Sequence, residues 1–172
     1  MVTDLTGMDL ANASLLDEGT AASEAMTMFY RVRKGPKKSS SKFFVSNKTY
    51  PQTVELLKTR SVPLGIKLVI DDVSNFDYSD DFFGALIQYP DSDGNIESPS
   101  SFIEKCNEKN IFTCVCSDLM SLVLFKPPGE FGASAVVGNS QRFGVPMGFG
   151  GPHAAFFATK EEFKRHIPGR II

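Results

Sequence analysis

Short apolar runs alternate with helix-like segments along most of this chain, and this alternation limits the folds open to it. The runs predict strands at residues 43–46, 66–70, 84–89, 111–116, 135–137 and 155–158. Segments with one apolar face predict helices at residues 14–30, 51–60 and 100–110, and a further helix that begins within residues 161–166. Because the strands are mostly unbroken apolar runs, we expect helices on both faces of the sheet. The pattern predicts a three-layer α/β domain with a largely parallel sheet, whose ligands gather at the carboxyl ends of the strands.

Local signals place some of the element ends. Ser14, followed by Asp17 and Glu18, supplies a capping residue and first-turn acids and predicts the start of the first helix. The basic run at residues 33–38 contains Gly-Pro and predicts its end. That run could bind phosphate or RNA, but it lacks interleaved aromatic side chains, so we interpret it as a solvated helix end and loop. Residues 91–94 predict a turn.

Size and composition favour an ordinary globular domain. The 172 residues are 42% hydrophobic and 22% charged, which indicates one domain spanning residues 1–172. A net charge of -2 gives no reason to expect nucleic acid or an anionic membrane as a partner. Cys106, Cys114 and Cys116 match neither a disulfide framework nor a zinc site, so a reducing compartment is expected. Neither a secretory signal nor a membrane-spanning run is recognisable, and the apolar ending suggests a piece of a longer polypeptide.

Residues 138–153 form a stretch rich in glycine that is too irregular for a regular helix or strand. Such freedom is typical of a backbone that wraps closely around something. The glycines do not form a G-x-G-x-x-G pattern between a strand and a helix, and no G-K-S/T follows them, so the dinucleotide signal is weak.

A few polar residues around this stretch could carry chemistry. Asp118 follows a predicted strand, where its carboxylate could serve a site or equally cap the next turn. Arg142 stays protonated, so it cannot form a Schiff base and would hold an anion or pair with Asp118 or Glu130. His153 could act as an acid or base, or as hydrogen-bonded scaffold. No metal site is expected, since the His and Cys spacings are wrong for one, and Ser14 and Ser140 lack the G-x-S-x-G context of a nucleophile. From the residues alone, this is an α/β ligand-binding domain whose ligand is not identified.

Several longer segments also resemble one family. They are MVTDLTGMDLANASLLDEGTAASEAM, YPQTVELLKTR, LIQYPDSDGNI, LFKPPGEFGASAVVGNSQRFGVPMGFGGPHAAFFAT and KRHIPGRII, and they are similar to the glycine decarboxylases, the P-proteins of the glycine cleavage system. The resemblance covers essentially the whole chain. It implies the aminotransferase-like fold of pyridoxal-phosphate fold type I, here an incomplete large domain. It also implies an enzyme that decarboxylates glycine with pyridoxal phosphate and passes the aminomethyl group to the lipoyl arm of H-protein.

The family has two homologous halves, fused or separate, and this chain resembles the middle of the N-terminal half. The catalytic half carries a His-Lys pair whose lysine forms the internal aldimine. In this chain the equivalent two positions are Gln141 and Arg142. The resemblance therefore implies no catalytic residue in this fragment. Asp118 falls where related enzymes place the acid that pairs with the pyridine nitrogen. The pseudo-site or active-site-lining candidates are Ser14, Glu18, Thr20, Asp118, Gln141, Arg142 and His153.

The segment expected to bind the cofactor phosphate differs from the corresponding segment of a cofactor-binding half. It reads Asp17-Glu18-Gly19-Thr20, and two carboxylates beside a phosphate are unfavourable even though a helix start suits an anion. We therefore expect the other half to hold the cofactor, and we expect residues 138–153 to be a relic of a cofactor loop at a subunit interface. Tyr50 and Ser134 also depart from the family pattern, which puts local polar contacts in doubt.

The resemblance also implies partners and a compartment. The expected partners are the lysine-bearing half and H-protein, with a homodimer or a two-by-two heterotetramer as the assembly. The compartment would be the mitochondrial matrix in a eukaryote and the cytoplasm in a bacterium. Two alternatives stay open, an assembly or regulatory module and a nucleotide-binding α/β domain.

Overall fold

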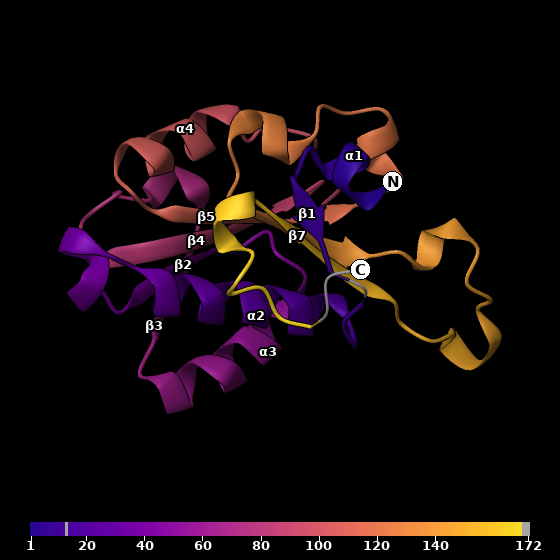
Figure 1. Ribbon diagram of the computed structural model, residues 1–172, viewed down its shortest axis with the longest axis horizontal. Helices are drawn as coiled ribbons and strands as arrows, with labels where there is room; N and C mark the ends of the chain where they lie inside the picture. Colours follow the sequence, from indigo (N-terminus) through magenta and orange to yellow (C-terminus); the bar gives the residue numbers. More distant parts are fainter. Residues whose placement is uncertain (13, 170–172) are drawn as a thin grey trace.

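A seven-stranded sheet runs through the middle of the molecule (Figure 1). The computed structural model describes residues 1–12 and 14–169. The strands in chain order are β1 (Leu10–Ala11), β2 (Lys42–Ser46), β3 (Lys67–Asp71), β4 (Phe82–Tyr89), β5 (Phe112–Asp118), β6 (Ala135–Asn139) and β7 (Ala155–Thr159). Their order across the sheet is β1-β7-β6-β5-β4-β2-β3.

The sheet is largely parallel, as the alternation predicted. The neighbours β3, β2, β4, β5 and β6 all pair in parallel, whereas β7 is antiparallel to both β6 and β1. Asp118 pairs with Asn139 at the last step of the β5–β6 ladder. The carboxyl ends of the two strands therefore lie side by side.

Helices cover both faces of the sheet. The α-helices are α1 (Val2–Thr6), α2 (Glu18–Val32), α3 (Pro51–Ser61) and α4 (Ser100–Glu108). Shorter 3₁₀ helices are η1 (Gly35–Ser39), η2 (Val62–Leu64), η3 (Val73–Asn75), η4 (Ser121–Val123), η5 (Pro128–Phe131), η6 (Gln141–Phe143), η7 (Gly148–Gly150) and η8 (Glu161–Phe163). Figure 1 shows α1 and α4 above the sheet and α2 and α3 below it, so the expected three layers are present.

In the longest helix, α2, the sequence determines both the first residue of the helix and the face that is buried. Asp17 is its N-cap, and the carboxylate accepts a hydrogen bond from the backbone N–H of Thr20 at 2.6 Å. The prediction that Ser14 caps this helix was wrong, because α2 begins only at Glu18 and residues 14–17 are not helical. The predicted apolar face is confirmed, since Met26 and Phe29 are fully buried.

Other element predictions need smaller corrections. The helix expected within residues 161–166 is only the single turn η8 in the described part of the chain. The sequence reading also missed α1, which ends at Gly7 with a φ of 67°, and the two-residue edge strand β1. The turn at residues 91–94 is confirmed by a hydrogen bond from the N–H of Gly94 to the carbonyl of Asp91 at 3.0 Å.

The basic run at residues 33–38 is not uniformly solvated as expected. Lys37 is buried, and its Nζ donates to the carbonyl of Ser79 at 3.2 Å and to Asp80 at 3.0 Å. A buried ammonium needs such partners because its desolvation is costly. This contact fixes the loop after α2 to the segment that enters β4.

The core consists of two apolar clusters, one on each face of the sheet. Below it, Phe29 of α2 stacks on Phe112 with ring centroids 5.2 Å apart. Above it, Phe44 packs on Phe76 at 4.5 Å and on Phe102 of α4 at 6.1 Å. Each buried phenylalanine contributes about 1.5–3 kcal/mol of transfer free energy, so these clusters hold both helical layers on the sheet.

Candidate functional site

A cavity of about 610 Å³ opens at the carboxyl ends of β4, β5 and β6. The starts of α2 and α3 and the loop after β6 complete its walls. It is lined by Glu18, Tyr50, Thr53, Gln88, Cys116, Ser117, Asp118, Gly138, Asn139, Gln141, Arg142, Gly144, Val145 and Met147. The position agrees with the expectation that ligands of a parallel α/β sheet lie beyond the carboxyl ends of its strands.

Asp118 and Arg142 form an ion pair in this cavity. Nε and Nη2 of Arg142 both donate to Oδ2 of Asp118, at 3.1 and 2.7 Å. The other carboxylate oxygen, Oδ1, accepts from the backbone N–H of Met120 at 3.0 Å. The hydrogen bonds to Asp118 and the charge of its carboxylate raise the pKa of Arg142 above its ordinary value. Asp118 thus caps the turn and pairs with Arg142, while Glu130 lies near Lys126 instead.

A second polar cluster joins the start of α2 to the loop after β6. Oε2 of Glu18 accepts from Nδ2 of Asn139 at 2.9 Å and lies 3.3 Å from Nδ1 of His153. The same His153 nitrogen lies 3.0 Å from Asn139 Nδ2. The carboxylate of Glu18 therefore occupies the helix start, where an anionic ligand would otherwise find the positive end of the helix dipole.

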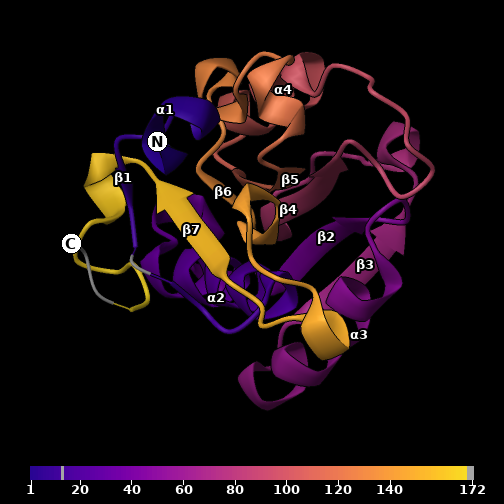
Figure 2. The same cartoon turned by 90° about the vertical axis from the view of Figure 1, so that its right-hand side faces the viewer.

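Gln141 links the two ends of the glycine-rich loop, residues 138–153, by hydrogen bonds. Its backbone N–H donates to Oδ1 of Asn139 at 2.8 Å, and its Nε2 donates to the carbonyls of Pro152 at 2.9 Å and Gly150 at 3.4 Å. Ser140 adds two hydrogen bonds to the carbonyl of Ala154, both at 2.8 Å. These contacts hold the two ends of the loop together (Figure 2).

The structure brings some of the predicted site residues together and leaves others outside. Glu18, Asp118, Gln141 and Arg142 line the cavity. Ser14, Thr20 and His153 are not among its lining residues, although His153 lies against the carboxylate of Glu18, which lines the cavity.

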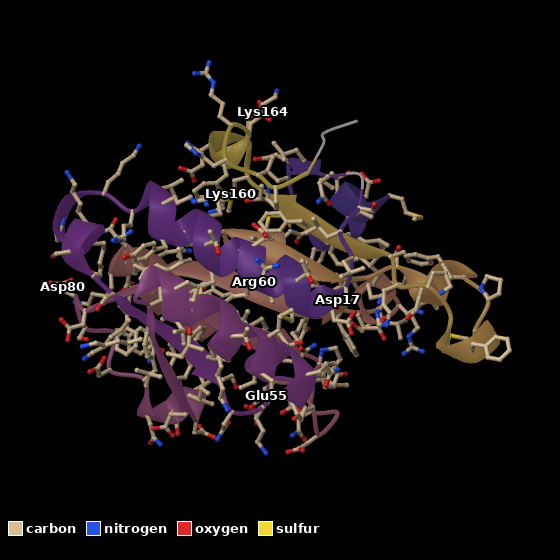
Figure 3. The ribbon with its side chains drawn as sticks, turned by 90° about the horizontal axis from the view of Figure 1, so that it is seen from below. Asp17, Glu55, Arg60, Asp80, Lys160 and Lys164 are labelled. Carbon is tan, nitrogen blue, oxygen red and sulfur yellow. The ribbon has the colours of Figure 1, made fainter. Side chains whose placement is uncertain are left out.

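Sequence reasoning missed Asn139, which connects Glu18, His153 and Gln141 through its side chain. Its place at the end of a predicted strand was the available signal. Gln88 and Ser117 lie one residue before the ends of β4 and β5, and both line the cavity. Figure 3 shows Asp17 on the side of the molecule that carries the loop after β6, whereas Asp80 lies at the opposite end.

Tyr50 and Ser134, the two residues that differ from the family pattern, lie in different surroundings. Tyr50 lines the cavity and is partly exposed. The hydroxyl of Ser134 accepts from the backbone N–H of Thr113 at 3.2 Å, and its carbonyl accepts from Thr159 at 2.6 Å. Ser134 is thus a buried connection between β5 and β7.

The glycines nearest the cavity serve chain packing. A Cβ on Gly19 would lie 3.2 Å from Leu56 of α3, and one on Gly138 would lie 2.1 Å from the carbonyl oxygen of Ser117. Both positions are explained by close approach of protein to protein, so neither indicates contact with a ligand.

Pyridoxal phosphate does not fit this set of residues. Among the described residues that line the cavity there is no lysine, and the acid Asp118 is already paired with a permanent cation. At the helix start Asp17 occupies the N–H of Thr20, and Glu18 would face the phosphate with a like charge.

The described residues also hold no group of three or more His, Cys, Asp or Glu side chains arranged for a metal ion. In that same part of the chain, no helix combines the length and apolarity needed to cross a membrane.

The fold defines an α/β domain of the pyridoxal-phosphate fold type I class. A family model described as "Glycine cleavage system P-protein" matches residues 1–172. The chain belongs to this family.

Named relatives and solved structures agree. The chain is 55% identical to a glycine dehydrogenase (decarboxylating) of Christiangramia forsetii, over 100% of this chain and 18% of the relative. It is 51% identical to a mitochondrial glycine dehydrogenase (decarboxylating) A of Flaveria pringlei, over 100% of this chain and 16% of the relative. The chain thus spans less than a fifth of the curated relatives it matches.

Among solved structures, a crystal structure of glycine decarboxylase (P-protein) in inhibitor-bound form is similar with a TM-score of 0.86 and 31% identity, covering 99% of this chain and 39% of the other. Cystathionine gamma synthase of Xanthomonas oryzae has the same fold, with a TM-score of 0.69 at 16% identity over 96% of this chain and 42% of the other.

Proposed function

We propose that this chain is part of a glycine decarboxylase. That enzyme decarboxylates glycine with pyridoxal phosphate and transfers the aminomethyl group to the lipoyl arm of H-protein. The proposal is supported by membership of the P-protein family over residues 1–172 and by relatives that are named glycine dehydrogenase (decarboxylating).

Within that enzyme, residues 1–172 are proposed to be one cofactor-domain-like unit of the half without the Schiff-base lysine. The observation that carries this assignment is the Arg142–Asp118 pair. A guanidinium cannot take the place of a lysine amine because it stays protonated. It also neutralises the acid that would otherwise face a pyridine nitrogen. The chemistry therefore belongs to the other half, and this half supports that site by packing against it.

The proposed partners follow from the same assignment. They are the lysine-bearing half, in a homodimer or a two-by-two heterotetramer, and H-protein with its lipoyl group. The domain makes up 39% of the crystallised P-protein chain but only 16–18% of the curated relatives quoted above, which supports a family with both separate and fused halves. The Flaveria relative is named mitochondrial, so we propose the mitochondrial matrix if the source is eukaryotic and the cytoplasm if it is bacterial.

Borohydride trapping tests which half carries the cofactor. The complete enzyme would be reduced in the presence of pyridoxal phosphate, digested and mapped by mass spectrometry. We expect the pyridoxyl label on a lysine outside residues 1–172, together with release of carbon dioxide from glycine. A label on any lysine within these residues would overturn the assignment.

A pure assembly module is the second candidate, and the exposure of the apolar side chain of Met147, which lines the cavity and is 68% exposed, favours it. The variants Arg142→Ala and Asp118→Ala in the complete enzyme separate the two functions. Loss of activity in an intact assembly supports a contribution to the site, whereas unchanged activity with weaker assembly supports the module.

A further inference from the structure

A second cavity, of about 450 Å³, lies at the end of the sheet opposite the cavity described above. Lys160 lines it directly after β7, and the preceding Thr159 pairs with Ala135 at the start of β6. Asn139, which lines the first cavity, lies at the other end of β6, about 13 Å from Ala135 along the strand. We call the second space the amino-end cavity, and it is separate from the site described above.

Cations outnumber acids on the walls of the amino-end cavity. Its described lining residues include Lys34, Lys37 and Lys160 but only one acid, Glu162. Lys37 is paired with Asp80, whereas neither Lys34 nor Lys160 forms an ion pair with a described residue. Lys160 is also partly buried, so its ammonium has lost part of its hydration without gaining a counter-charge. The cavity therefore carries an excess of positive charge.

Hydrogen-bond donors converge beside Lys160. Its Nζ and the Nδ2 of Asn107 both donate to the carbonyl of Gly132, at 3.1 and 3.2 Å, so the two nitrogens are neighbours. Each nitrogen keeps further N–H groups that this carbonyl does not use. Ser134 also lines the cavity and is 4% exposed; its hydroxyl accepts from the N–H of Thr113, and no described residue accepts its proton. A buried hydroxyl with an unused proton favours an acceptor in the cavity.

Two features oppose an anion in this cavity, and the structure limits both. The helix α4 ends here, and the carboxyl end of a helix dipole is negative. Its last carbonyls are already bonded, however, since those of Cys106 and Asn107 accept from the N–H groups of Ile111 and Asn110. The acid Glu162 is exposed, so its charge is screened by solvent. The excess of positive charge and of donors therefore decides the character of the cavity.

We propose that the amino-end cavity binds a phosphate oxyanion, either free or as the phosphoryl group of an organic molecule. Lys34 and Lys160 supply charge, and Ser134 and Asn107 supply neutral donors, a combination that suits an anion with several acceptor oxygens. A carboxylate has only two oxygens and would leave more of these donors unused. Phe112 also lines the cavity and offers an apolar wall to an organic body. The site goes beyond the function proposed above and does not depend on it.

Lysine footprinting of the complete enzyme tests the site. The enzyme, saturated with pyridoxal phosphate so that the cofactor's own phosphate site is filled, would be acetylated with and without excess inorganic phosphate at constant ionic strength. Mass spectrometry would then measure the labelling of each lysine. We expect phosphate to lower labelling of Lys34 and Lys160 by about threefold or more, and to leave Lys38 unchanged, because Lys38 is exposed and outside the lining. Equal protection of all three lysines, or of none, would overturn the proposal.

Three variants of equal charge change measure the contribution of the cavity lysines. Lys160→Met and Lys34→Met should each weaken phosphate binding by about tenfold, followed by ³¹P NMR titration of the complete enzyme, because each removes a charge-assisted hydrogen bond. Lys34 makes no side-chain capping bond, so its variant keeps the fold even if that of Lys160 does not. Lys38→Met is the control and should bind as the parent does. Equal weakening by all three variants would overturn the proposal.

Phenyl phosphate distinguishes the two sources of the oxyanion. Tighter binding of phenyl phosphate than of inorganic phosphate would identify an organic monoester, because its ring can pack on Phe112. Equal binding of the two would identify free phosphate, and both results support the proposal. Binding of neither probe, which is also the result expected if another part of the enzyme fills the cavity, would overturn it. Release of carbon dioxide from glycine is measured separately and reports only on the function proposed above.

Discussion

Arg142 directs two hydrogen bonds at a single oxygen of Asp118, at 3.1 and 2.7 Å, and leaves the other oxygen to the backbone of Met120. The pair is partly exposed, so its free energy is discounted for screening by solvent. Asp118→Asn keeps an oxygen for the turn and removes the charge. We expect it to lower the stability of the domain by about 1 kcal/mol or less, measured as a small fall in the apparent melting temperature. A drop as large as that of a core substitution would show that the pair does more than occupy the cavity.

Gly138 should tolerate no side chain. Its added Cβ would lie 2.1 Å from the Ser117 oxygen and 2.8 Å from the Phe156 ring, so β5, β6 and β7 would have to shift. We expect Gly138→Ala to destabilise the domain by about 3 kcal/mol or more, seen in the melting temperature and the soluble yield. Gly148→Ala is the control, because its Cβ would meet open space. Similar losses in the two variants would contradict this explanation.

Lys37 and Asp80 should respond unequally to substitution. Lys37 is 3% exposed, whereas Asp80 is largely solvated. Asp80→Ala strands a buried ammonium and should cost more stability than Lys37→Met, which removes the buried charge and returns Asp80 to water. Denaturation of both variants beside the parent protein checks the order, and the reverse order would refute the argument.

Cys106 should be an unreactive thiol in the folded protein. Burial raises its pKa from 9.0 to about 12. Below pH 9 the thiol is protonated in both the folded and the unfolded chain, so it adds no pH dependence. Between pH 9 and 12 only the unfolded chain loses the proton, so stability falls as the pH rises, by up to about 1.4 kcal/mol per unit. Native Cys106 should resist iodoacetamide at pH 8 and react once the protein unfolds, and rapid native labelling would contradict this.

Asp17 should contribute as a helix cap. Asp17→Ala leaves the N–H of Thr20 without its partner and should cost about 1 kcal/mol, while Asp17→Asn should recover most of that. The melting temperatures of the two variants check it. Equal losses would indicate that charge at the helix start matters more than the hydrogen bond.

The sequence by itself determined the layers. Apolar runs such as residues 135–137, spaced between helix-like segments, favour buried strands. The spacing of Met26 and Phe29 indicates that one helix face is covered, so the alternation along the chain favours the three-layer arrangement. The ionisation of Arg142 was also predictable, because it is a property of the guanidinium.

Only the tertiary structure decided which polar groups meet. From the sequence, Asp118 could cap the turn that follows its strand, pair with Arg142, or do both. Glu130 was an equally good candidate partner for Arg142. The parallel register of β5 and β6 brings Asp118 beside Asn139 and places Arg142 within reach. Likewise, Ser14 and Asp17 are both good caps, and the contacts at the start of α2 select Asp17. Side-chain chemistry is local, but partners separated by tens of residues are chosen by the register and packing of the whole sheet, which no short stretch of sequence contains.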